Sequence, residues 1–91
     1  MASTVKLLGS EGNLVSDSNV GFAKVVRVLN NKTTVQAITW KNAGGTTLGT
    51  VTLGAGEVAY IEKASTDTLL GVATSLAVGV AYSNYWRKSL H

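Results

Sequence analysis

The chain contains no cysteine and no proline, and its single histidine is the last residue, His91. Without cysteine it can form neither a disulfide nor a thiolate metal site, and one histidine cannot build an imidazole cluster. The sequence therefore predicts no metal ion and no cofactor. Small domains without these supports often depend on association, because a chain of 91 residues buries only a little over ~60% of its unfolded surface. We expect a homo-oligomer or incorporation into a larger assembly.

Charged residues are also scarce, at 14% of the chain against roughly 25% in ordinary soluble domains. Few charges and many small polar residues suit a surface that is covered by partners. The net charge is +3, but the cationic side chains are scattered, and only Arg87 and Lys88 are adjacent. This distribution forms no basic patch and argues against nucleic acid as a partner.

Long hydrophobic runs are absent as well. The most apolar stretch, residues 69–82, is interrupted by glycines and by Thr74 and Ser75, and it is shorter than the ~18 residues of a membrane-spanning helix. The first residues lead into no apolar core of a signal peptide. We therefore expect no membrane association, and a cytoplasm, or a particle assembled in one, as the compartment.

The chain does contain a series of short β-patterned segments separated by tight turns. Residues 30–32, 41–45 and 54–56 form these turns, and their Asn and Gly residues tolerate φ > 0. At least one of Gly54 and Gly56 should adopt φ > 0. The expected strands are residues 4–8, 20–29, 33–40, 46–53, 57–62 and 76–82, while residues 69–73, in an ambiguous region, could begin a helix. The pattern predicts an all-β fold, a small antiparallel β-sandwich or jelly-roll-like barrel of about seven strands.

This organisation predicts a single β domain over residues 1–91. Residues 1–19 should form an N-terminal strand and a polar surface loop, and residues 84–91 a C-terminal tail. In residues 76–82 large and small side chains alternate, which predicts one large face and one close-packed small face. Strands 20–29 and 57–62 carry apolar residues on both faces, so a second sheet or another subunit should cover the second face.

No arrangement of residues indicates catalysis. Glu57 and Glu62 are an odd number of positions apart in one expected strand, so they should lie on opposite faces rather than form a glycosidase pair. His91, at the chain end, is a poor candidate for the base of a Ser/His/Asp triad. Residues 54–56 read Gly-Ala-Gly, but no helix follows to complete a phosphate-binding loop. We expect the protein not to be an enzyme.

The aromatic residues are the remaining candidates for a binding site. Exposed rings on a sheet can stack on bases or sugars, so a carbohydrate- or nucleic-acid-binding β-module is an alternative function. The expected strands lack the interleaved cations of such a platform, which favours a core position for the ring residues Phe22, Trp40, Tyr60 and Tyr82.

Three residues beyond the last expected strand, Tyr85, Trp86 and Arg87, combine the side chains that are typical of interface hot spots. They are candidate partner-interface residues. The alternative is a tail that folds back on its own domain.

The central part of the chain resembles small structural proteins of tailed phages, of the marine and cyanobacterial type. The resemblance is carried by residues 38–53, Ile-Thr-Trp-Lys-Asn-Ala-Gly-Gly-Thr-Thr-Leu-Gly-Thr-Val-Thr-Leu, by Gly56-Glu57, and by residues 60–69, Tyr-Ile-Glu-Lys-Ala-Ser-Thr-Asp-Thr-Leu. It implies a virion component without catalytic residues: a capsid decoration or cement protein that stabilises subunit junctions. The implied partners are the major capsid protein or other virion subunits, in a virion assembled in the host cytoplasm. A tail or neck component is the alternative within this resemblance.

Overall fold

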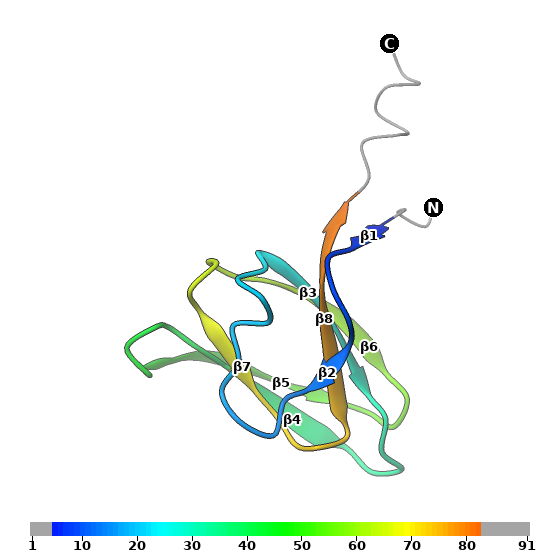
Figure 1. Cartoon of the computed structure of the whole chain (residues 1–91). Helices are drawn as coiled ribbons and strands as arrows, with labels where there is room; N and C mark the ends of the chain where they lie inside the picture. The colour runs from blue at the N-terminus through cyan, green and yellow to red at the C-terminus, as the bar shows by residue number, and fades with distance from the viewer. Residues whose placement is uncertain (1–4, 83–91) are drawn as a thin grey trace.

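The computed structural model describes residues 5–82, which form two antiparallel sheets packed face to face (Figure 1). The fold is all-β, as predicted, and is a small β-sandwich. Its strands are β1 (Val5–Leu7), β2 (Gly12–Asn13), β3 (Val25–Asn30), β4 (Gln36–Lys41), β5 (Thr47–Leu53), β6 (Val58–Glu62), β7 (Thr68–Leu70) and β8 (Ser75–Tyr82).

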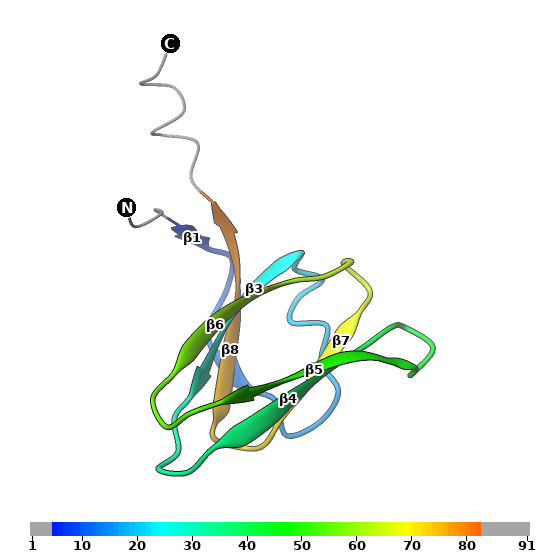
Figure 2. The same ribbon diagram turned by 180° about the vertical axis from the view of Figure 1, so that it is seen from behind.

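Sheet A has the strand order β1-β8-β3-β6, and β2 also pairs with β8. Leu7 pairs with Val80 while Gly12 pairs with Ala77, so β1 and β2 form one interrupted edge, with extra residues bulging out opposite Val78. Sheet B has the order β5-β4-β7. From β3 onward, β4 and β5 are the one pair of successive strands that lie in the same sheet. Each other connection passes from one sheet to the other (Figure 2).

The turns have the residues that their backbone requires. Gly45 ends the β4–β5 hairpin at φ 88°, and Gly56 in the turn before β6 has φ 75°, which confirms the expected φ > 0 in that turn. The Asn42 side-chain Oδ1 accepts hydrogen bonds from the backbone amides of Gly44, at 2.9 Å, and Thr46, at 3.0 Å. These local bonds fix the hairpin that keeps β4 and β5 together.

The core lies between the inner faces of the two sheets. Its buried members come from β3, β4, β5, β7 and β8, and from the connection between β2 and β3. They are Leu14, Ala23, Val26, Val28, Ile38, Leu53, Leu69 and Ala77. Trp40 is half-buried against this cluster, as expected for a core aromatic residue.

Strand β8 has the expected large and small faces, and the small face points inward. Ala77 is buried in the core, and Gly79 lies beneath the chain that crosses above it. A Cβ placed on Gly79 would be 2.7 Å from Ala23 Cβ and 3.3 Å from the Val20 carbonyl oxygen. This face of β8 must therefore carry small residues, because the segment that contains Val20 and Ala23 packs directly onto it.

Several sequence-based expectations are wrong. Residues 20–24 are not strand, because Val20, Gly21 and Phe22 all have positive φ, at 53°, 66° and 60°. Residues 33–35 precede β4 rather than belonging to it. The segment 9–19 is not purely a surface loop, since it contains β2 and Leu14, which is fully buried.

Two of the aromatic residues expected in the core are instead exposed. Phe22 is 63% exposed in the left-handed turn, and Tyr60 is 47% exposed on β6. The Tyr82 side chain lies outside the part that the structure describes, although its backbone belongs to β8. The ambiguous segment after residue 68 begins with the strand β7 and continues into a turn.

Candidate functional site

The expected partner-interface residues, Tyr85, Trp86 and Arg87, lie outside the described residues, as does the tail 84–91. Their role therefore stays a prediction. The surfaces and hollows that residues 5–82 form are the places where a site can be sought.

Within residues 5–82 no group of three His, Asp or Glu side chains comes close enough to hold a metal ion. Most carboxylates of this part of the chain have structural partners. Glu57 Oε1 accepts a hydrogen bond from the Gly54 amide at 2.7 Å, and Asp17 forms an ion pair with Lys41 at 3.3 Å. These partners occupy the acids in turns and on the surface and leave no pair poised for acid–base chemistry.

The outer face of sheet A carries rows of apolar side chains, some of them exposed. Strand register places one row across Leu7, Val80 and Val25, and another across Leu76, Leu29 and Val58. Tyr60 lies between these rows at the edge of the sheet. Leu7 is 69% exposed and Val58 37%. We call this surface, residues Leu7, Val25, Leu29, Val58, Tyr60, Leu76, Val78 and Val80, the outer face.

An ion pair crosses the middle of the outer face. Arg27 on β3 contacts Glu11, in the bulge between β1 and β2, with 3.3 Å between Nη1 and Oε2. Because Arg27 is the register partner of Val78, the pair passes above Val78, which is 5% exposed. This pair matches two charges of the face, while Glu62, the register partner of Val25, adds an exposed carboxylate at its β6 edge.

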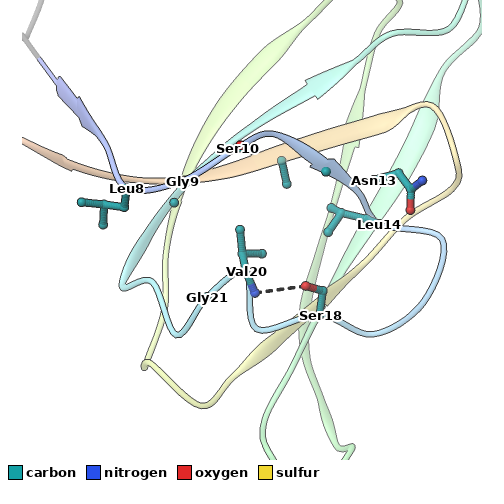
Figure 3. A pocket seen from close by; sticks show the side chains of 11 residues that line it. Leu8, Gly9, Ser10, Asn13, Leu14, Ser18, Val20 and Gly21 are labelled. Carbon is teal, nitrogen blue, oxygen red and sulfur yellow. Dashed lines mark hydrogen bonds between the residues drawn. The ribbon is translucent and has the colours of Figure 1, made fainter.

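A pocket of about 210 Å³ lies on the opposite side of β2 and β8, beneath the segment 14–22 (Figure 3). Part of its wall is backbone, because the lining residues Gly9, Gly12, Gly21 and Gly79 contribute no side chains. The Val20 side chain points into it. The lining contains no charged residue, so the pocket has no means of holding an ionic ligand by charge.

The left-handed turn beside this pocket is strained. A β-branched residue such as Val20 and a bulky one such as Phe22 rarely adopt φ near 55°. Hydrogen bonds between residues close in sequence hold the turn: the Val20 amide donates to Ser18 Oγ at 3.1 Å, and the Phe22 amide donates to Asn19 Oδ1 at 3.2 Å. The result is an aromatic ring presented to solvent at the end of the sandwich.

A cluster of buried polar groups lies next to Ala23, the residue that follows the left-handed turn. The Trp40 indole N–H donates to Asp67 Oδ2 at 2.9 Å, and the same carboxylate accepts from the Ala64 amide at 3.1 Å. The Lys63 ammonium, only 5% exposed as a residue, donates to the Ala23 carbonyl oxygen at 2.6 Å. Burial lowers the pKa of Lys63, and the nearby Asp67 carboxylate partly offsets this. These bonds join sheet B to the chain that leads into β3.

An apolar groove of about 150 Å³ lies between the two sheets. Strands β5 and β6 diverge from the turn at 54–56 (Figure 2). Ile38, Trp40 and Val51 line it from sheet B, and Ile61 from sheet A. Val51 is 40% exposed although it belongs to the inner face of β5. Core side chains are therefore accessible along this side of the sandwich.

Comparison of the chain with protein-family models, curated proteins and solved structures finds no match. Within the described range there is no helix of the length and apolarity needed to cross a membrane. The fold and its surfaces define the chain as a small two-layer antiparallel β-sandwich.

One of these features could be predicted from the sequence, and three could not. The apolar character of both faces of β3 and β6 was readable, and it corresponds to the outer face. The pocket and the groove had no sequence signal, because each is formed by segments far apart in the chain. A left-handed Val-Gly-Phe turn also had none, since its residues favour a strand.

Proposed function

We propose that this protein is a non-enzymatic structural component of a virion, a capsid decoration or cement protein that stabilises subunit junctions. The observation that carries the proposal is the outer face, where Leu7, Val58 and Tyr60 are exposed around the buried Val78 and Val80. Exposed apolar surface of this kind is typical of protein–protein interfaces. In this proposal, the major capsid protein or another virion subunit covers the outer face.

The chemistry of the outer face supports this role. Leu7, Val58 and Tyr60 supply exposed apolar area, and because Arg27 and Glu11 are paired, Glu62 at the β6 edge is the charge that contact would have to desolvate. Binding through such a surface gains free energy from apolar burial and requires no chemical turnover. The resemblance of the central segment to phage structural proteins supports the same role and the virion as its location.

A sugar- or nucleic-acid-binding module has less support. Stacking platforms combine several aromatic rings with cations. Here Phe22 lies in the turn at one end of the sandwich, Tyr60 lies on the edge strand β6, and the nearby Arg27 is engaged with Glu11. A tail or neck component remains an alternative virion role, because an apolar outer face would serve either attachment.

A matched series of Val→Glu variants tests the proposal. Val58→Glu places a charge on the outer face, whereas Val35→Glu changes an exposed valine in the β3–β4 connection. We expect Val58→Glu to abolish occupancy on virus particles that lack the protein, and Val35→Glu to bind as the wild type does. Circular dichroism of each variant establishes that it is folded. Absence of the protein from purified virions by mass spectrometry, or full occupancy by Val58→Glu, would refute the proposal.

A further inference from the structure

The edges of the two sheets differ in how they are protected. Exposed strand edges recruit other strands unless they are short, charged, bulged or covered. The β1–β2 edge is short and bulged, and β7 is covered by a bridge from Ser18, whose amide donates to the Leu69 carbonyl oxygen at 3.1 Å. Strand β6 is flanked by Glu57 and ends with Glu62.

Strand β5 has none of these protections along most of its length. It spans seven residues, Thr47–Leu53, that include no charge and no proline. Among residues 5–82 it pairs only with β4, through a register that shifts only at its Thr47 end. Its side chains are mostly exposed. Strand β5 is therefore the edge best suited to accept another strand.

The groove beside β5 adds a place for side chains of an incoming strand. Strand addition joins main-chain hydrogen bonds, which supply affinity, to pockets for alternate side chains, which supply specificity. The groove is lined by Ile38, Trp40, Val51 and Ile61, so it accepts an apolar or aromatic side chain. Filling it would bury the exposed part of Val51.

We propose that β5 and this groove form a strand-addition site, and that its occupant is the C-terminal segment, residues 83–91, of a second copy of the chain. The segment has nine residues and no proline, so it is long enough to pair along β5. It carries Tyr85 and Trp86, the kind of side chains that fill an apolar groove.

Charge complements this apolar fit. The segment contains Arg87 and Lys88, and the acidic side chain of Glu57 lies in the turn that joins β5 to β6, whereas Glu62 belongs to the outer face and does not line the groove. Opposite charges across an interface favour the correct register and speed association. Strand β5 itself carries no charge that would oppose the segment.

The direction in which β8 leaves the sandwich identifies a second copy, rather than the same chain, as the source. Strand β3 pairs with β8 only as far as Val80, while β1 continues with β8 to Tyr82. The ends of β1 and β8 thus project as a two-stranded ribbon beyond the body of the sandwich (Figure 2). Strand β8 therefore ends at the tip of this ribbon, beyond the body of the sandwich that contains its own groove. Reciprocal exchange between two copies would give a symmetric dimer.

Complementation between two variants tests the proposal. Trp86→Ala removes the side chain that enters the groove, and Val51→Glu places a charge in the groove itself. We expect each variant to dimerise at least about tenfold more weakly than the wild type. An equimolar mixture should recover a heterodimer, because one intact segment and one intact groove remain. Sedimentation velocity and native mass spectrometry measure both. Val35→Glu should dimerise normally.

Cysteine cross-linking gives a second measurement, which does not depend on whether the Val51→Glu variant folds. Because the chain has no native cysteine, a mixture of Val51→Cys and Ser89→Cys chains can form only engineered disulfides. We expect a disulfide between these two chains, and none when Val35→Cys replaces Val51→Cys. Three results would each overturn the proposal. The first is a monomeric wild type, and the second is dimerisation that neither Trp86→Ala nor Val51→Glu affects. The third is a cross-link that forms only within single chains of a Val51→Cys/Ser89→Cys double variant.

The two proposals fail separately. Loss of particle occupancy in Val58→Glu with normal dimerisation supports the outer face alone. Loss of dimerisation in Val51→Glu is independent of whether the assembly is a virion.

Discussion

The side-chain nitrogen Nδ2 of Asn30 lies 3.0 Å from the carbonyl oxygen of Leu53, so the last residue of β3 in sheet A holds the last residue of β5 in sheet B. The same nitrogen is 2.9 Å from the Thr34 carbonyl oxygen and 3.0 Å from that of Gly54. Oδ1 of Asn30 accepts the Lys32 amide at 3.2 Å. One fully buried side-chain amide therefore joins the β3–β4 and β5–β6 connections between the sheets.

Replacing this donor should destabilise the fold strongly. Asn30→Asp keeps the size of the side chain but turns an oxygen toward three carbonyl oxygens in a buried site. We expect a loss of about 2–3 kcal/mol in the free energy of unfolding, because buried acceptors lose their partner. Asn31→Asp, one residue later on the surface, should change it by less than about 0.5 kcal/mol. Urea denaturation measures both, and similar stabilities would contradict this role of Asn30.

The close approach at Gly79 gives a second prediction. Gly79→Ala would put a methyl group 2.7 Å from Ala23 Cβ, so the segment above β8 must shift. We expect a loss of about 1–3 kcal/mol from this overpacking. Gly12→Ala, on the adjacent β2, meets no heavy atom within 4 Å and should be nearly neutral. Equal thermal stability of the two variants would show that the loop over Gly79 adapts without cost.

Strain at Phe22 predicts a stabilising substitution. Its φ of 60° costs an L-residue about 1–2 kcal/mol, which glycine avoids at a smaller cost in unfolded-state entropy. Phe22→Gly should therefore be more stable than Phe22→Ala, which keeps the Cβ and the strain. Chemical denaturation of the two variants decides this, and the opposite order would mean that the turn is relaxed in solution.

The buried ammonium of Lys63 should make stability rise with pH. Its folded pKa is lowered by burial below the ordinary 10.5. Between these two pKa values the unfolded chain binds more protons than the folded chain, so the free energy of unfolding increases as pH rises through this window. Urea unfolding of the wild type and of Lys63→Met from about pH 8 to about pH 10.5 should give a difference that grows in favour of the wild type. A constant difference would contradict the shift.

Strand segments and hairpin turns were predictable here because they depend on local chemistry. Residues 46–53 and 57–62 alternate as strands do, and Gly56 supplies the positive φ of the turn between them. The fold class follows from this repetition. The inward direction of the small face of β8 was not predictable, since it depends on the contact of Gly79 with Ala23.

The candidate sites were less accessible to sequence reasoning. Phe22 has high strand propensity, so only the observed dihedral angles reveal its turn. The groove combines Trp40 with Ile61, which lie on different sheets, and its opening depends on where β5 and β6 separate. The two-sided apolar character of β3 and β6 did indicate a surface such as the outer face, although not which residues would be exposed.

The pairing of Val5 with Tyr82 also determines how this domain responds to tension. The two residues are neighbours at the free tip of an antiparallel ribbon, so a pull applied between them would separate β1 from β8 one hydrogen-bonded pair after another. Such a peeling geometry resists force weakly, because the pairs are loaded in sequence rather than together. Tension carried between these two ends would open the ribbon before it reached the sandwich, whereas load entering through the sheet faces would be shared by the whole packed core.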